Sequence, residues 1–207
     1  MPADFNPSDT LNEIIFADDS TTFRKLLSEK LYELNHLNKI TEADNGEQVI
    51  EYIKNGAITQ LAILDLKMPL LNGYETAKWI KQYQPIIKIL VLTMFEDKMV
   101  KELALQSGAD AVLTKNSNIT DIQAVINELI NGTYQSALPY PPSLTIMEVE
   151  LLKYICTDLK FETIANKMNI SLRQTERLRE KLFKIFQIQD RTKLASHAIS
   201  NGIVILN

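Results

Sequence analysis

Several features that would point to other classes of protein are scarce or missing in this chain of 207 residues. Its single cysteine, Cys156, cannot form an internal disulfide, which fits a reducing cytosol, and is expected to be an inert core residue. No run of about 18 apolar residues exists, so no membrane-spanning helix is expected. Residues 1–9 lack the basic and apolar pattern of a signal peptide. The two histidines, His36 and His197, have no cysteine or histidine at ligand spacing, so the sequence does not indicate that kind of metal site.

Charge is unevenly distributed along the chain, although the net charge is only −4. Residues 1–139 contain 12 basic and 19 acidic side chains, whereas residues 140–207 contain 10 basic and 7 acidic ones. The stretch TYQSALPYPPSL at residues 133–144 holds three prolines and is typical of a semi-rigid linker. We therefore predict an acidic domain over 1–132, a linker over 133–144 and a mildly basic domain over 145–207.

Short apolar runs alternate with amphipathic segments throughout residues 1–132. The runs expected to form strands are 13–17, 37–43, 61–65, 86–93 and 110–113. Helices are expected to begin near Ser20, Asn45, Tyr74, Glu96 and Ile119. The first of these helices has an apolar stripe of Phe23, Leu26, Leu27, Leu31 and Leu34. Five successive pairs of a strand and a helix predict an α/β fold with a doubly wound, five-stranded parallel sheet.

The stretch LAILDLKMPLLNG at residues 61–73 carries the first candidate site residue. Its short apolar run is typical of a strand buried on both faces, and the Met-Pro and Asn-Gly pairs that follow are turn signals. The strand is therefore expected to end at Asp65, at the edge of the sheet where open α/β folds build their sites. Taken alone, Asp65 is better explained as a turn or capping residue, which is the usual role of an Asp before such a loop.

Four more polar residues follow other strands of the predicted sheet. Asp18 and Asp19 follow the first strand, Thr93 ends the fourth, and Lys115 follows the fifth. The carboxyl ends of parallel strands share one edge of the sheet, so these side chains are expected to lie near Asp65. Clustered carboxylates repel one another, and a hard divalent cation relieves that repulsion. A carboxylate beside Mg²⁺ can accept a phosphoryl group, whose oxygens then need a hydroxyl and a cation.

The pieces FADD, LDLKMPLLNG and VLT, with the strand before Lys115, resemble the flavodoxin-like receiver domain of two-component response regulators over residues 11–132. The resemblance implies that a sensor histidine kinase passes a phosphoryl group to Asp65. It also implies that the protein is not an enzyme, apart from its own phosphorylation and dephosphorylation. The Mg²⁺ ligands that it implies are the carboxylates of Asp18, Asp19 and Asp65 and the backbone carbonyl of Lys67. Thr93 and Lys115 become the contacts of the phosphoryl group.

Two positions depart from the receiver pattern. Val112 stands three residues before Lys115, where receivers usually carry an aromatic switch residue, and Asn116 stands where Pro or Asp is common. Activation is therefore expected to run through the loop and helix at 93–99, or through dimerisation. Phosphatases with an aspartate nucleophile share much of this chemistry, but they need an Asp two residues after the nucleophile. Here that residue is Lys67, so this alternative is discounted.

Residues 145–207 are predicted to be helical throughout, with helices at 146–156, 161–168, 171–186 and 191–200. A tight turn at 169–171 joins two of them, which is typical of a helix-turn-helix. The helix after this turn has an apolar face formed by Thr175, Leu178, Leu182, Ile185 and Phe186. Roughly opposite lies a basic face formed by Arg173, Arg177, Lys181 and Lys184. A basic face alone is more often a solvated surface, but the preceding helix and turn favour DNA contact.

The pattern LTIMEVELLKYIC, ETIANKMNIS and DRTKLASHAISNGIV resembles the LuxR-type helix-turn-helix of the NarL/FixJ subfamily over residues 144–204. Gln174 and Thr175 replace the usual Thr-Val, Ile185 replaces a usual Lys, and Glu176, Arg177 and Glu180 take positions that usually face the DNA groove. The resemblance implies a cytoplasmic, phosphorylation-dependent transcription regulator that binds double-stranded DNA as a homodimer and has no membrane contact. The alternative is a degenerate output domain that binds a protein instead. The predicted DNA-contacting residues are Arg173, Gln174, Glu176, Arg177, Glu180, Lys181 and Lys184.

Overall fold

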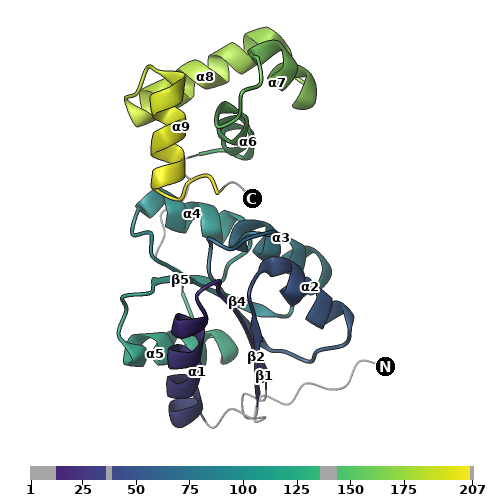
Figure 1. Ribbon diagram of the computed structural model, residues 1–207, viewed down its shortest axis with the longest axis vertical. Coiled ribbons are helices and arrows are strands. Elements are labelled where there is room, and N and C mark those ends of the chain that lie inside the picture. The colour runs from purple at the N-terminus through teal and green to yellow at the C-terminus, as the bar shows by residue number, and fades with distance from the viewer. Residues whose placement is uncertain (1–12, 36–38, 136–143, 206–207) are drawn as a thin grey trace. The chain divides into compact units, whose positions relative to one another are not determined.

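The computed structural model describes residues 13–35, 39–135 and 144–205 (Figure 1). These residues form two compact units, one built on a β-sheet and one made of helices. Most of the predicted linker at 133–144 lies outside the described residues. No helix within the described ranges is both long and apolar enough to cross a membrane.

The sheet unit contains five parallel strands in the order β2-β1-β3-β4-β5. The strands are β1 (Glu13–Ala17), β2 (Lys39–Ala43), β3 (Leu61–Leu64), β4 (Lys88–Thr93) and β5 (Ala111–Thr114). This order reverses direction between β1 and β3, which are neighbours in the sheet but separated in sequence by β2. The predicted doubly wound, flavodoxin-like architecture is therefore confirmed, and its switch point lies between β1 and β3.

Helices cover both faces of the sheet, which explains why strands β1, β3 and β4 are mostly apolar and buried, whereas the edge strand β2 is more polar and more exposed. Side chains alternate along a strand, so Ile14 and Phe16 of β1 pack with α1 (Thr21–Asn35) and α5 (Ile119–Ile130) on one face. Ile15 and Ala17 point to the other face and are also fully buried. That face is covered by α2 (Gly46–Lys54) and α3 (Gly73–Tyr83), as Figure 1 shows, and α4 (Lys98–Gln106) follows β4.

Local signals define the ends of several helices as the sequence predicts. The Asn45 side chain accepts a hydrogen bond from the Gln48 amide at the start of α2, and Gly56 takes a φ of 87° just after its end. Gly132 takes a φ of 69° after α5 in the same way. These positions need no tertiary contact to be recognised, because capping depends on residues within one turn of each other.

Two predicted core positions are wrong. Ile86 was expected in the buried part of the fourth strand, but it is 84% exposed. The Ile87 amide donates to the Gln84 carbonyl, so Pro85 and Ile86 form a turn, and Pro suits the second position of such a turn. Leu26 was expected in the buried stripe of α1 and is 58% exposed. The predicted start of the second strand, at residues 37 and 38, lies outside the described part of the chain.

The helical unit contains α6 (Ile146–Ile155), α7 (Phe161–Lys167), α8 (Leu172–Phe186) and α9 (Arg191–Ser200). Thr145 and Glu148 form a reciprocal capping box at the start of α6, and Ser171 and Gln174 form another at the start of α8. Asn169 takes a φ of 53° in the turn between α7 and α8. Helix α8 packs on both α6 and α7, so the predicted helix-turn-helix order is present. Burial raises the pKa of the Cys156 thiol to about 11, so this half-buried side chain is protonated at neutral pH.

Candidate functional site

Three carboxylates meet at the switch point of the sheet. Asp18 and Asp19 follow β1, Asp65 follows β3, and each side chain offers an oxygen within 4.8 Å of the others. Asp18 is fully buried, Asp65 is 4% exposed, and Asp19 is exposed. The site is therefore an acidic cluster that opens to solvent on the side of Asp19.

The loop after β3 holds Asp65 in place through the backbone. The Asp65 amide donates to the Ala17 carbonyl at 2.8 Å, and its Oδ1 accepts from the Leu66 amide at 2.8 Å. Gly73 begins α3 directly against this loop, because a Cβ there would lie 2.2 Å from the Asp65 carbonyl oxygen. The Asn-Gly pair was predicted as a turn signal, and its glycine is needed for this close approach of the helix.

Lys115 is the cation of the cluster. Its Nζ lies 2.7 Å from Asp18 Oδ2 and 3.1 Å from Asp65 Oδ2, and it also lies 5.0 Å from the centre of the Phe23 ring. The side chain is 9% exposed. A single ammonium group therefore bridges the two buried carboxylates.

Thr93 ends β4 at the same edge of the sheet and is fully buried. Its carbonyl accepts from the Lys115 amide at 2.8 Å, which ties the end of β4 to Lys115. Its Oγ1 accepts from the Phe95 amide at 3.2 Å and keeps its own proton for donation. The fold thus gathers Asp18, Asp19, Asp65, Thr93 and Lys115 at one edge of the sheet, as the spacing of the strands predicts.

The electrostatics of the cluster leave one carboxylate poorly neutralised. Burial raises the pKa of Asp65 to about 6, and the neighbouring Asp18 adds to the increase while Lys115 opposes it. Burial works to lower the pKa of Lys115, but the carboxylates of Asp65 and Asp18 outweigh it and raise that pKa above its usual value. Three acids facing one cation leave excess negative charge in a largely buried place.

This donor set fits a hard divalent cation such as Mg²⁺. All three groups are carboxylates, their oxygens lie close enough to share one ion, and a cation would relieve the repulsion that raises the pKa of Asp65. Lys67, the predicted source of a further carbonyl ligand, lies two residues after Asp65 with its side chain exposed. The residues present therefore match the predicted ion in chemistry.

The face predicted to contact DNA is exposed on α8. Arg173, Arg177, Lys181 and Lys184 are all exposed, whereas Thr175 and Leu182 on the opposite face are fully buried. The amphipathic pattern of this helix is therefore confirmed. In the part of the chain that the structure describes, no ion pair joins Glu176 or Glu180 to Arg173 or Lys184.

Two of the residues predicted to contact DNA have partners inside the helical unit. The Lys181 ammonium pairs with Glu148, a carboxylate that is 1% exposed and also accepts from Thr145. Burial works to raise the pKa of Glu148, but the hydrogen bonds from Lys181 and Thr145 lower it below its usual value. The Gln174 oxygen accepts from the Ser171 amide in the capping box. Sequence reasoning missed the pairing of Glu148 with Lys181, because it depends on how α6 packs against α8.

A family model described as response regulator receiver domain matches residues 14–127, more than half of the chain. The chain belongs to the response regulators. It is 25% identical to the probable transcriptional regulatory protein NarL of Mycobacterium tuberculosis, over 96% of this chain and 99% of that protein. It is 23% identical to the response regulator GacA of Pseudomonas aeruginosa, over 93% of this chain and 97% of that protein.

The solved structures include RcsB of Salmonella enterica serovar Typhimurium bound to the promoter rprA in the presence of phosphomimetic BeF₃⁻. The TM-score is 0.66 at 19% sequence identity, and the match covers 92% of this chain and 99% of that one. At this identity the likeness shows the fold of the response regulator.

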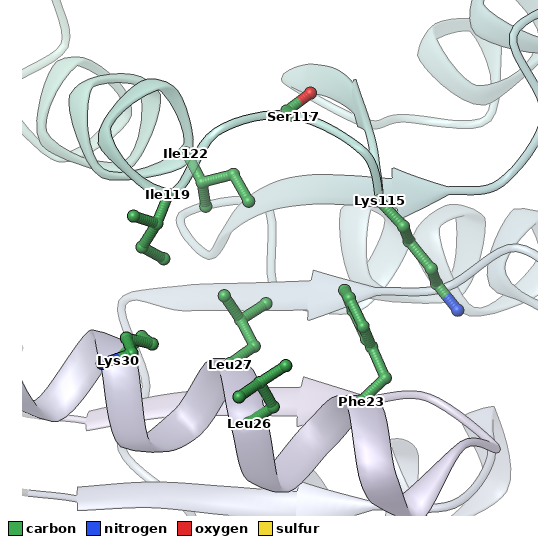
Figure 2. A pocket seen from close by; sticks show the side chains of 8 residues that line it. All are labelled: Phe23, Leu26, Leu27, Lys30, Lys115, Ser117, Ile119 and Ile122. Atoms are coloured by element: carbon green, nitrogen blue, oxygen red, sulfur yellow. The ribbon is translucent and has the colours of Figure 1, made fainter.

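A hollow of about 140 Å³ lies beside Lys115 of this response regulator, between α1 and the start of α5 (Figure 2). Leu26 and Leu27 line it from α1, and Ile119 and Ile122 line it from α5. Leu26, predicted to be core, instead faces this hollow. The Lys115 side chain extends past Phe23 toward the acidic cluster, so the hollow adjoins the candidate site without holding any of its carboxylates.

Arg24 is 6% exposed, although it was not among the predicted core or site residues. Helical geometry provides the signal that could have found it. At about 100° per residue, Arg24 lies about 40° from the midpoint of Leu27 and Leu31, whereas Leu26 lies about 120° away. Arg24 therefore belongs to the buried side of α1, and Leu26 does not.

Proposed function

We propose that this response regulator accepts a phosphoryl group on Asp65 from a sensor histidine kinase, and that phosphorylation controls the binding of double-stranded DNA by α8. The observation that carries the first half is the convergence of three carboxylates at the switch point of the sheet, two of which contact one buried lysine. A buried acidic cluster of this kind is costly to keep in a fold, which favours a functional role over a structural one.

In the proposed reaction, a carboxylate oxygen of Asp65 attacks the phosphorus of the donor. An O–P bond forms to Asp65, and the bond from phosphorus to the leaving group breaks and takes its electron pair with it. Lys115, now 3.1 Å from Asp65, is placed to pair with the new phosphoryl oxygens, and the Thr93 hydroxyl is placed to donate to one of them. Attack of water on the same phosphorus would reverse the modification.

Asp18, Asp19 and Asp65, with the carbonyl of Lys67, are the proposed ligands of Mg²⁺. When bound, this ion neutralises the charge that builds up on the transferring phosphoryl group and orients its oxygens. The protein residues would hold the ion through Asp18, which is buried and fixed, and through Asp19, which faces solvent.

The proposed output is supported by the exposed basic residues of α8 and by what the solved relative, RcsB, is described as binding. Among the described residues, Arg173, Arg177 and Lys184 make no ion pair, and the negative charges of Glu176 and Glu180 offset part of their positive charge. A single copy therefore neutralises few phosphates, and we propose that two copies bind adjacent half-sites as a homodimer. If the kinase acts inside the cell, the protein is cytoplasmic, and a single unpaired cysteine suits that reducing compartment.

Labelling with a small phosphodonor tests the first half of the proposal. The full chain is incubated with acetyl phosphate and Mg²⁺, and intact mass spectrometry detects the gain of one phosphoryl group. Asp65→Asn should abolish the gain, Asp19→Asn should weaken it, and the exposed Asp158→Asn should leave it unchanged. Labelling that survives in Asp65→Asn would show that another residue is the acceptor.

DNA retardation with a salt titration tests the second half. The logarithm of the binding constant should fall with the logarithm of salt concentration by about 0.9 for each phosphate neutralised. Arg177→Ala should weaken binding to all sequences and reduce this slope by about one. Binding and a slope that are both unchanged in Arg177→Ala would exclude α8 as the DNA-contacting helix. A full-length phosphorylated protein that binds no DNA would favour a protein partner.

A further inference from the structure

The buried Arg24 of α1 connects the loop of the acidic pair to the edge strand of the sheet. Its guanidinium donates to the Asp18 carbonyl, its Nε lies 3.2 Å from Glu42 Oε2, and its third nitrogen lies 2.5 Å from Asp44 Oδ1. Glu42 lies near the end of β2 and Asp44 just after it, so they are two residues apart on the same side of that strand. The side chain of Arg24 is 7% exposed and its contact with the Asp18 carbonyl is buried, whereas the side chains of Glu42 and Asp44 are 36% and 56% exposed.

The contact with the Asp18 carbonyl fixes more than Asp18. The peptide group is planar, so holding this carbonyl also orients the amide of Asp19 and the direction in which Asp19 leaves the strand. Asp18 has further supports, because its Oδ1 accepts from the Ser20 amide and its Oδ2 lies against Lys115. Within the described residues, the Asp19 side chain makes no hydrogen bond or ion pair. The placement of the Asp19 carboxylate in the acidic cluster therefore depends on its backbone.

We infer that Arg24 is a positioning residue for the divalent cation. It holds the peptide between Asp18 and Asp19 so that both carboxylates face Asp65. This inference rests on the proposed function, since it concerns the same ion, and it adds a residue outside the phosphoryl contacts. A planar fork suits the task, because one guanidinium can bind the carbonyl and two carboxylates in fixed directions.

Simple electrostatics predicts the opposite effect, which makes the inference testable. Arg24 carries a positive charge near a cation site, and removing it leaves Glu42 and Asp44 without that partner. By charge alone, the loss of Arg24 should tighten the binding of Mg²⁺. By position, the loss should weaken binding, because the Asp18–Asp19 peptide is no longer held.

The experiment is a calorimetric titration of the full chain with Mg²⁺ alone, at a temperature where the fluorescence of Trp79 shows the sheet unit to be folded. Arg24→Gln should weaken Mg²⁺ binding by roughly 10–100-fold, as loss of a group that orients a metal ligand usually does. Arg24→Lys keeps the positive charge but loses the planar fork. Its affinity for Mg²⁺ should therefore lie between those of wild type and Arg24→Gln. Lys30→Gln removes an exposed charge from the same helix and should leave the affinity unchanged.

Labelling by acetyl phosphate gives a second readout that a purely structural role would not produce. The labelling rate of Arg24→Gln should be low at limiting Mg²⁺ and return to the wild-type rate at saturating Mg²⁺. Mg²⁺ affinity that is unchanged or tighter in Arg24→Gln overturns the inference, and so does an equal loss in Lys30→Gln. If Arg24→Gln does not fold, Arg24→Lys decides by the same criteria.

The two proposals can fail separately. If wild-type protein binds Mg²⁺ and the Arg24 variants weaken it, but acetyl phosphate labels nothing, the proposed phosphoryl acceptor falls and the role of Arg24 stands. If wild-type protein does not bind Mg²⁺, both fall.

Discussion

Replacing Asp65 by asparagine should stabilise the metal-free sheet unit while abolishing its proposed chemistry. Burial, reinforced by Asp18, raises the pKa of Asp65 from 3.8 to about 6. A difference of about two pKa units corresponds to about 3 kcal/mol that favours the protonated over the ionised form in the folded state. Asparagine resembles the neutral form, and Lys115 keeps its contact with Asp18 at 2.7 Å. We therefore expect Asp65→Asn to increase the free energy of unfolding at pH 7 by about 1–3 kcal/mol.

The sign of the pH dependence follows from the same shift. Between the unfolded pKa of 3.8 and the folded pKa of about 6, the folded state binds more protons than the unfolded state. Ionised Asp65 therefore lowers the free energy of unfolding by its full amount above pH about 6, and this loss of stability disappears as the pH falls toward 4. Metal-free wild type should become more stable on acidification across this window, and Asp65→Asn should lose this part of the dependence.

The single tryptophan makes the measurement specific to the sheet unit. Trp79 lies in α3, so its fluorescence in a urea titration reports unfolding of that unit and not of α6–α9. With a slope of about 1–3 kcal/mol per molar urea, the midpoint should rise by about 1 M at pH 7 in the presence of a chelator. Asp121→Asn, an exposed acid on α5, should shift the midpoint little. A midpoint for Asp65→Asn at or below that of wild type would refute the reasoning, as would a wild-type midpoint that is the same at pH 7 and pH 5.

Three further predictions concern the helical unit. Gln187 is the C-cap residue that follows α8 and has a φ of 55°, a conformation that glycine adopts more readily. Gln187→Gly should therefore stabilise the helical unit by up to about 1 kcal/mol. Slower hydrogen exchange of the α8 amides would confirm this, and faster exchange would contradict it. Lys181→Ala leaves the buried carboxylate of Glu148 without its ammonium partner and should destabilise the helical unit by about 1–3 kcal/mol. If the stability instead equals that of wild type and only the salt slope of DNA binding is reduced, Lys181 contacts DNA. If Glu176 and Glu180 accept hydrogen bonds from cytosine, replacing both by glutamine should cost roughly 1–3 kcal/mol of sequence preference and raise the non-specific affinity for DNA. Binding to a set of DNA sequences measures this preference. An unchanged preference would mean that the two glutamates are surface charges only.

The sequence by itself was enough to predict the order of the elements and the place of the candidate site. Apolar runs of strand length, each followed by an amphipathic segment, predict a doubly wound sheet, and in such a sheet every strand end falls on one edge. Asp18, Asp65, Thr93 and Lys115 could therefore be grouped before any distance was known. The helix ends at Asn45 and Ser171 were equally accessible, because a cap and the amide it accepts from lie within one turn of the chain.

Only the tertiary structure decided which side chains lie inside and with which partners. Arg24 and Leu26 are two residues apart, yet the arginine is buried and the leucine exposed. Helical spacing places Arg24 on the side of Leu27 and Leu31, but only the packing of α1 on the sheet shows that this side is the buried one. The contact of Lys181 with Glu148 joins residues 33 positions apart and depends on how α8 crosses α6. The raised pKa of Asp65 likewise depends on burial and on charges brought from β1 and β5. Local patterns fix the type of each element, whereas burial and charge pairing arise from segments that meet only in the folded chain.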